Sequence, residues 1–168
     1  MKNILSVVFI IAFLISFGSE KYDCIYKKNS TVDWTKKYPF VNAEKIIWVS
    51  WKQTGKERPK TIMNFTTDSI QWQIFSDTIT IDFASEKKLT DILFNYKYRV
   101  KGNYDLSSKC YDPRDAVLFL DKNGRLIDYV EMCFECTDYR LMTTKWKFDF
   151  CEGKLDLLAK YKSALFKK

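Results

Sequence analysis

The chain has 168 residues and a net charge of +7, with 46% hydrophobic, 17% aromatic and 29% charged residues. This length and composition predict one folded domain with a sizeable core, and they exclude a disordered or low-complexity chain. The chain contains no histidine. That absence excludes Ser-His-Asp and Cys-His catalysis, together with every zinc site built on histidine.

Residues 1–18 have the pattern of a cleaved export signal. Lys2 gives a positive start, an almost uninterrupted apolar run follows, and Ser16 and Gly18 are small residues suited to a cleavage site. The apolar run is shorter than the roughly 20 residues that cross a bilayer. We expect cleavage near Gly18–Ser19, no stable membrane span afterwards, and an exported chain that is periplasmic or secreted. A retained membrane anchor is the alternative.

Residues 19–43 carry many aromatic side chains but no regular hydrophobic period, and Pro39 argues against a helix. We expect an irregular N-terminal segment that packs over the rest of the chain. Residues 44–168 are then expected to form a single α+β domain.

Alternation of apolar and polar residues predicts an antiparallel sheet of about five to six strands. In chain order the predicted strands are 43–52, 61–66, 70–75, 78–83, 116–120 and 125–133, with a further short strand at 98–100. Both faces of the first strand are mostly apolar, with Trp48 and Trp51 on opposite faces, so this strand should be central. Of the tryptophans Trp48, Trp51 and Trp72, we expect all but one in the core.

A period near 3.6 residues predicts two packed helices, at about 86–96 and 152–167. Ser85 is a suitable N-cap for the first helix. The expected buried stripes are Leu89, Ile92, Leu93 and Tyr96 in the first helix and Leu155, Leu158, Tyr161 and Leu165 in the second. Residues 137–150 are expected to be irregular.

The sequence Asp121-Lys122-Asn123-Gly124 predicts a tight turn between the last two strands. A turn centred between Lys122 and Asn123 places Leu120 opposite Arg125. Continued backwards, this register brings Cys110 near residues 135 and 136.

Five cysteines in an exported chain predict disulfide bonds, because export delivers the thiols to an oxidising compartment. If the Cys133-Phe134-Glu135-Cys136 segment is extended, Cys133 and Cys136 face opposite sides, which disfavours a bond between them. Four cysteines allow three pairings. We favour Cys110–Cys136 and Cys133–Cys151, which leaves Cys24 free or paired with another molecule.

Two other sulfur chemistries remain open. Cys133 and Cys136 could form a thiol-handling pair, although Glu135 between them would raise the thiol pKa. Cys110, Cys133, Cys136 and Cys151 could instead hold zinc through four thiolates. A structural set of disulfides with no cofactor is the preferred interpretation.

Acid–base catalysis without histidine would need a pair of carboxylates, as in glycosidases. Asp128, Glu131 and Glu135 are close in sequence, but Asp128 and Glu131 have opposite strand parity. We therefore assign no catalytic residue, and a carboxylate-dependent hydrolase stays an alternative. The basic residues are spread as pairs rather than clustered, so no nucleic acid is expected as a partner.

Four segments carry a resemblance to a known group of proteins: residues 110–114, the strand 116–120, the turn 121–124 and residues 131–136. Together with a later cysteine and a Leu-rich terminal helix, they resemble a family of small exported bacterial proteins of uncharacterised function with a Cys-Phe-Glu-Cys segment. The similarity covers roughly the last third of the chain and the helix at 89–95. It implies an exported α+β domain and assigns no activity.

The sequence favours an exported, non-enzymatic binding or interaction domain that is stabilised by disulfides. Its partner would be a protein or small ligand that the sequence does not specify.

Overall fold

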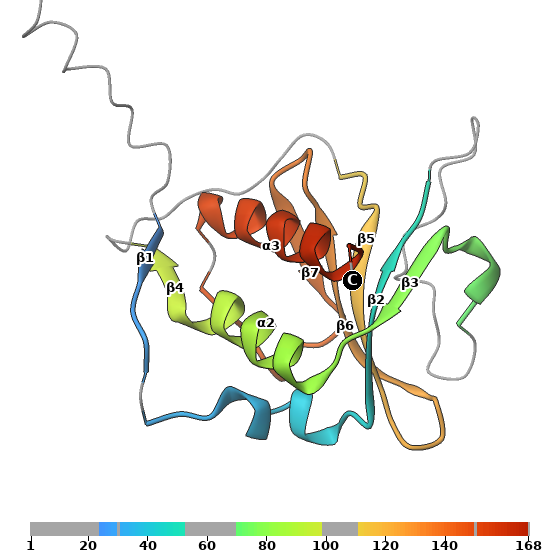
Figure 1. Cartoon of the computed structure of the whole chain (residues 1–168), viewed down its shortest axis with the longest axis horizontal. Helices are drawn as coiled ribbons and strands as arrows, with labels where there is room; N and C mark the ends of the chain where they lie inside the picture. The colour runs from blue at the N-terminus through green and yellow to red at the C-terminus, as the bar shows by residue number, and fades with distance from the viewer. Residues whose placement is uncertain (1–23, 30, 53–69, 99–110, 150, 168) are drawn as a thin grey trace, which may run out of the picture.

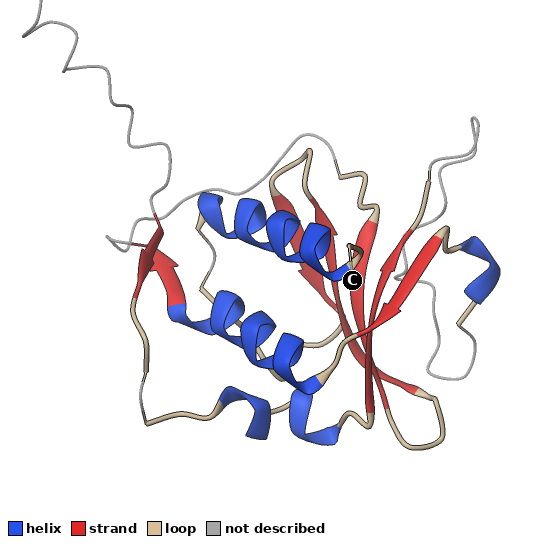
Figure 2. Ribbon diagram, in the orientation of Figure 1, coloured by secondary structure: helices blue, strands red, loops and turns tan. Residues whose placement is uncertain are grey.

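A computed structural model describes residues 24–29, 31–52, 70–98, 111–149 and 151–167. The strands are β1 (Cys24–Tyr26), β2 (Lys45–Ser50), β3 (Asp77–Thr80), β4 (Tyr96–Tyr98), β5 (Asp115–Leu120), β6 (Leu126–Cys133) and β7 (Asp138–Leu141). The α-helices are α2 (Phe83–Asn95) and α3 (Glu152–Leu165), with short 3-10 helices η2 (Trp34–Lys36), η3 (Phe40–Asn42) and η5 (Trp72–Ile74). Five strands form one antiparallel sheet in the order β3-β2-β5-β6-β7, and β1 pairs with β4 in a small second sheet. Figures 1 and 2 show both α-helices on one side of the large sheet. The predicted α+β class with a sheet and two helices is therefore confirmed.

The helices α2 and α3 cover one face of the sheet because each carries an apolar stripe of helical period. Leu89, Ile92 and Leu93 of α2 are buried, and so is the predicted stripe of α3. From the sheet, Trp48 of β2 and Phe119 of β5 join the same core. Burial of apolar side chains at this interface is the main force that holds the two layers together.

The opposite face of the sheet is also buried. Its core comprises Ile47, Val49, Trp51, Ala116, Leu118, Leu120, Leu126 and Tyr129, with Ile70, Phe75 and Met142 packed against it. The strand β2 is therefore covered on both faces and lies inside the sheet, as its sequence predicts. Trp48 and Trp51 are buried while Trp72 is 41% exposed, so two of the three tryptophans belong to the core as expected.

The N-terminal segment is more regular than the sequence predicts. Residues 24–26 form β1, and two 3-10 turns follow. Its aromatic side chains do pack over the domain: the Trp34 ring stacks on Phe94 of α2 at 4.3 Å, and the Tyr38 hydroxyl donates a hydrogen bond to Asp128 at 2.9 Å. The strand β1 was missed because three residues carry too little periodicity to distinguish a strand from a loop.

Several predicted boundaries are wrong. Residues 72–74 form η5 where a strand was predicted, and the predicted strand at 61–66 lies outside the described residues. The predicted strand at 78–83 ends at Thr80. Phe83 is the first residue of α2, and it is 67% exposed. The Asp82 carboxylate accepts a hydrogen bond from the Ser85 backbone N–H at 2.7 Å, so Asp82, not Ser85, is the N-cap.

The hairpin of β5 and β6 forms around the predicted turn, but its register differs. Leu120 pairs with Leu126 rather than with Arg125, and a bulge beyond it shifts the remaining pairs so that Phe119 lies opposite Asp128. Gly124 has φ +77°, which explains the glycine in this turn. After β6 the chain reverses into β7, where the sequence predicted no regular structure.

None of the helices in the described part of the chain is long and apolar enough to cross a membrane.

Candidate functional site

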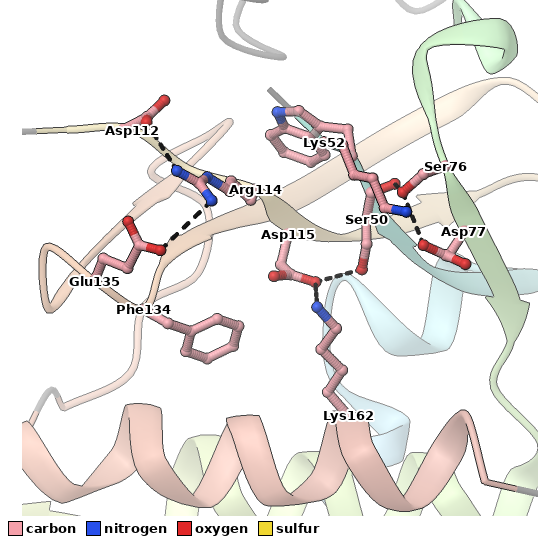
Figure 3. Close-up of a pocket in the computed structure, with 11 residues that line it drawn as sticks. Ser50, Lys52, Ser76, Asp77, Asp112, Arg114, Asp115, Phe134, Glu135 and Lys162 are labelled. Carbon is pink, nitrogen blue, oxygen red and sulfur yellow. Dashed lines mark hydrogen bonds and ion pairs between the residues drawn. The ribbon is translucent and has the colours of Figure 1, made fainter. Parts of the chain in front are cut away.

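An open cleft of about 570 Å³ lies between α3 and one end of the strands of the sheet (Figure 3). Its lining residues are Ser50, Trp51, Lys52, Ser76, Asp77, Asp112, Arg114, Asp115, Phe134, Glu135 and Lys162. They come from the end of β2, the start of β5 and the segment before it, the start of β3, the turn after β6 and the last turn of α3. Charged groups of both signs and two aromatic rings therefore surround one space.

An ion pair between a buried carboxylate and a partly exposed lysine forms the floor of the cleft. Asp115 is 3% exposed, and its Oδ1 lies 2.6 Å from Lys162 Nζ. The same oxygen accepts hydrogen bonds from Trp48 Nε1 at 2.9 Å and from Ser50 Oγ at 2.5 Å. A carboxylate taken out of water needs such compensation, because an unpaired buried charge is strongly destabilising. The contact also anchors the C-terminal turn of α3 to the sheet.

Local periodicity places each member of this floor. Asp115 lies on the same face of β5 as Val117 and Phe119, and Ser50 shares a face of β2 with Trp48. Lys162 follows Leu158 by four residues and precedes Leu165 by three, so it lies at the margin of the buried stripe of α3, with its side chain 31% exposed. Sequence reasoning missed this pair, although a lysine on an apolar stripe is a signal that a buried acid must lie nearby.

The rim of the cleft carries a second group of charges. Arg114 lies between two carboxylates, 3.6 Å from Asp112 and 3.5 Å from Glu135. The Glu135 side chain is 70% exposed, so water screens these pairs and they contribute little stability. Lys52 is exposed at the end of β2. A charged ligand can therefore bind these rim groups with little loss of folding stability.

The floor is better suited to binding than to general acid–base catalysis. Ser50 donates to Asp115 Oδ1, and the same oxygen already contacts two other donors, Trp48 Nε1 and Lys162 Nζ. Lys162 is fully engaged with the Asp115 carboxylate at 2.6 Å. The arrangement fixes charge in place rather than preparing a nucleophile.

The segment Cys133–Cys136 forms a tight turn, not the extended chain on which the sequence prediction was based. Cys133 ends β6, and Thr137 takes the left-handed conformation with φ 52° as the chain reverses. The Cys136 backbone N–H donates to Cys133 Sγ at 3.2 Å, and the two thiols share a side-chain hydrogen bond. The sulfur atoms are therefore neighbours rather than on opposite faces.

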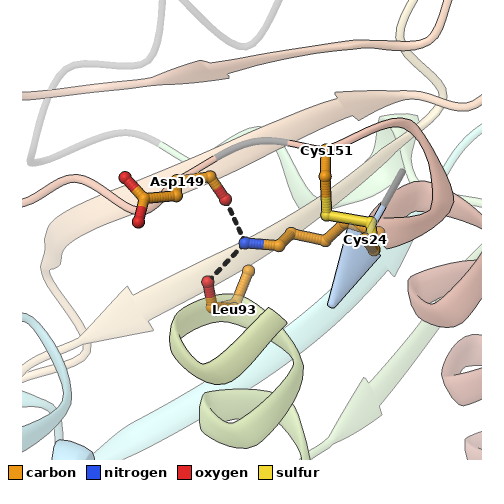
Figure 4. The surroundings of a disulfide bond; sticks show 5 residues. Cys24, Leu93, Asp149 and Cys151 are labelled. Atoms are coloured by element: carbon orange, nitrogen blue, oxygen red, sulfur yellow. Dashed lines mark hydrogen bonds between the residues drawn. A yellow bond between two sulfur atoms is a disulfide. The ribbon is translucent and has the colours of Figure 1, made fainter. Parts of the chain in front are cut away.

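The disulfide of the structure joins Cys24 to Cys151, with Cα atoms 5.4 Å apart and a sequence separation of 127 (Figure 4). The predicted Cys133–Cys151 bond and the assignment of Cys24 as a free or intermolecular thiol are both wrong. Cys133 and Cys136 carry thiols, and Cys110 lies outside the described residues. The alternative zinc site cannot use four thiolates, because the Cys151 sulfur is bonded to Cys24.

The pairing was mispredicted because Cys24 was placed in an irregular segment with no defined neighbour. The short pairing of β1 with β4 fixes Cys24 at the end of the β1–β4 sheet, opposite Tyr98, and Cys151 is the N-cap residue of α3. Such a long-range contact leaves no local signal in the sequence. Within the described residues, no group of three or more His, Cys, Asp or Glu side chains is arranged to hold a metal ion.

Lys154 is buried with no exposed surface, and its backbone N–H donates to the carbonyl of the disulfide residue Cys151 at 2.9 Å. Its ammonium group donates to the Leu93 carbonyl at 2.6 Å and to the Asp149 carbonyl. The Leu93 carbonyl lies in the last turn of α2, where a cation also interacts favourably with the helix dipole. Lys154 thus links the end of α2 to the start of α3. Burial lowers the pKa of this amine to about 7.

The carboxylates Asp128 and Glu131 point to opposite faces of β6, as their parity predicts. Asp128 lies opposite Phe119 on the helix-covered face, and Glu131 lies opposite Ala116 on the other. Asp128 accepts from the Tyr38 hydroxyl, and burial together with this bond raises the pKa of Tyr38 to about 12.

Glu131 is also fully buried and accepts from the Tyr111 hydroxyl at 2.9 Å. Burial and the neighbouring Glu131 carboxylate raise the pKa of Tyr111. Neither Asp128 nor Glu131 lines the cleft; of the three acids singled out from the sequence, only Glu135 does.

Comparison with known proteins gives no relative: no protein-family model, curated protein or solved structure matches this chain.

Replacing both disulfide cysteines, Cys24→Ser with Cys151→Ser, is expected to lower the free energy of unfolding by about 2–5 kcal/mol, because a long loop is no longer closed in the unfolded chain. Denaturant unfolding without reductant measures the change. Wild-type protein treated with reductant should move to the same unfolding midpoint. Equal unfolding midpoints for the oxidised wild type and the double variant would contradict a stabilising role of this disulfide.

Lys154 should make stability depend on pH. Its pKa is about 7 in the folded chain and near 10.5 when the chain unfolds. Between these values the unfolded state binds the extra proton, so the free energy of unfolding should rise as pH increases from about 7 to 9.5. Below pH 7 both states are protonated and this contribution is constant.

The change Lys154→Met should remove that rise, and denaturant unfolding at several pH values measures it. Lys160→Met is the matched control, because Lys160 lies exposed on the same helix. A wild-type curve parallel to that of Lys154→Met would contradict the assignment.

Proposed function

We propose that the chain is an exported, non-enzymatic interaction domain that binds a short charged peptide segment of a partner protein. The observation that carries this proposal is the cleft: a fixed ion pair at the floor, exposed charges of both signs at the rim, and two rings in the wall. Binding sites commonly combine apolar walls with a few placed polar groups.

The chemistry of the rim favours a peptide. Lys52 and Arg114 can pair with acidic side chains or a carboxylate, and Asp77 and Glu135 can pair with basic ones. The partly exposed ring of Phe134 offers aromatic surface to an apolar side chain between those charges. A peptide segment carries all three kinds of group within a few residues.

Export is the second part of the proposal. The Cys24–Cys151 disulfide supports it, because disulfides persist in oxidising compartments and are rare in the cytosol. The export pattern of residues 1–18 supports it from the sequence.

Export is tested by expressing the full chain in a bacterium that has a periplasm and then determining the N-terminal peptide by mass spectrometry. The mature chain should begin at Ser19 and be found outside the cytoplasm. The change Ile11→Asp, which places a charge in the apolar run, should leave an uncut chain inside the cell. A chain that keeps residues 1–18 in every fraction would contradict cleavage.

Binding is tested with the mature chain from Ser19 and a displayed library of random peptides, followed by calorimetric titration of the enriched sequences. Arg114→Gln or Phe134→Ala should weaken their binding about tenfold, since a lost charged hydrogen bond or ring contact is worth roughly 1–3 kcal/mol. Lys122→Gln, in the exposed turn at the far end of β5, should bind like the wild type. No enriched peptide, or equal binding by all three variants, would contradict the proposal.

A further inference from the structure

The turn that carries Cys133 and Cys136 also builds one wall of the cleft. Phe134 and Glu135 are the two residues between the sulfurs, and both line the cleft. Any change in the bonding of these two sulfurs therefore acts on two lining side chains directly.

The same turn is connected through Arg114 to the segment that precedes β5. Cys133 Sγ donates a hydrogen bond to the Asp112 carbonyl at 3.4 Å. Asp112 and Glu135 both form ion pairs with Arg114. Arg114 therefore links Asp112, whose carbonyl accepts the Cys133 hydrogen bond, to Glu135 inside the turn. Thiol, carbonyl and arginine form one connected set.

The two thiols are placed so that they can bond to each other. They share a hydrogen bond, and the backbone already reverses between them. In a compartment that keeps Cys24–Cys151 oxidised, a neighbouring pair of thiols meets the same oxidants.

We propose that Cys133 and Cys136 are a thiol–disulfide exchange site and that closing this pair resets the wall of the cleft formed by Phe134, Glu135 and Arg114. The co-reactant is a disulfide, of a small thiol or of an oxidoreductase. The proposal concerns the cleft wall, and it does not depend on which ligand the cleft binds.

The exchange proceeds in two displacements. Cys136, 9% exposed against 1% for Cys133, loses its proton and attacks one sulfur of the co-reactant, whose other sulfur leaves as a thiolate. Cys133 then loses its proton and attacks the Cys136 sulfur of the mixed disulfide, which releases the second thiolate. The protein pair is oxidised by two electrons, and the co-reactant is reduced to two thiols.

Closing the pair removes the S–H that Cys133 donates to the Asp112 carbonyl. The segment 111–114 then loses one of its contacts with the turn, while Phe134 and Glu135 become part of a small covalent ring. The ring restricts the conformations of these two side chains. Arg114 must then adjust to the lost hydrogen bond at Asp112 and to the restricted Glu135.

This site is a slow switch rather than a catalyst for other proteins. Burial raises the pKa of the Cys133 thiol to about 11, so little thiolate is present at neutral pH. A thiol–disulfide catalyst needs a thiol with a pKa near the ambient pH.

The test equilibrates the mature chain in glutathione buffers that run from reducing to oxidising, then traps thiols by alkylation and maps the peptides by mass spectrometry. We expect a Cys133–Cys136 link to form in buffers where Cys24–Cys151 stays closed. Amide hydrogen exchange of the two forms should differ at Asp112, Arg114 and Glu135, with exchange in the turn slowed about tenfold on closure. The turn Asp121–Gly124 should exchange equally in both forms.

Two variants separate the chemistry from simple damage to the turn. Cys136→Ser should show the same amide hydrogen-exchange pattern in all the buffers. Glu135→Gln retains both thiols and should form the Cys133–Cys136 bond as the wild type does. A link between Cys110 and Cys136, thiols that stay alkylatable in every buffer, or closure without a change at Arg114 and Asp112 would each overturn the proposal.

Discussion

Desolvation of carboxylates inside a sheet that is covered on both faces is the constraint on which the rest of the structure depends. Asp115, Asp128 and Glu131 are all buried in β5 and β6. A carboxylate that loses its water must find a cation or hydrogen-bond donors, because its charge is otherwise too costly to bury. Each acid recruits these partners from a segment distant in sequence, and each such contact fixes one part of the fold.

The partners of the three acids come from different elements. Lys162 attaches the end of α3 to the sheet, Tyr38 attaches the N-terminal segment, and Tyr111 attaches the segment before β5. The polar groups therefore specify how the layers join, while the apolar stripes provide most of the driving force. At the other end of α3, the disulfide and Lys154 hold the helix start against β1 and the end of α2.

The cleft follows from this arrangement. Its floor is the Asp115–Lys162 pair that the fold already requires, and its rim consists of exposed charges that the fold does not need. Substitutions at the rim can therefore change which ligand the cleft binds without unfolding the sheet. The turn with Cys133 and Cys136 is part of that rim, which is why the state of the sulfurs and the shape of the cleft are connected.

The sequence by itself determined the elements whose signal is local and periodic. The strand around Trp48, the hairpin of β5 and β6, and the two helices with their buried stripes are all readable from spacings of two or of three to four residues. The opposite parity of Asp128 and Glu131 followed from the same rule. Boundaries failed where short-range signals compete, as at Asp82 and Ser85, since either residue can cap a helix.

Only the tertiary structure decided the contacts between distant segments. Cys24 meets Cys151 because three residues of β1 pair with β4, and Lys162 meets Asp115 because the last turn of α3 lies at the start of β5. The close approach of Cys133 and Cys136 depended on a turn at a non-glycine residue, Thr137, with positive φ. Such contacts depend on where whole elements dock, and docking is set by the sum of many weak interactions that no single stretch of sequence contains.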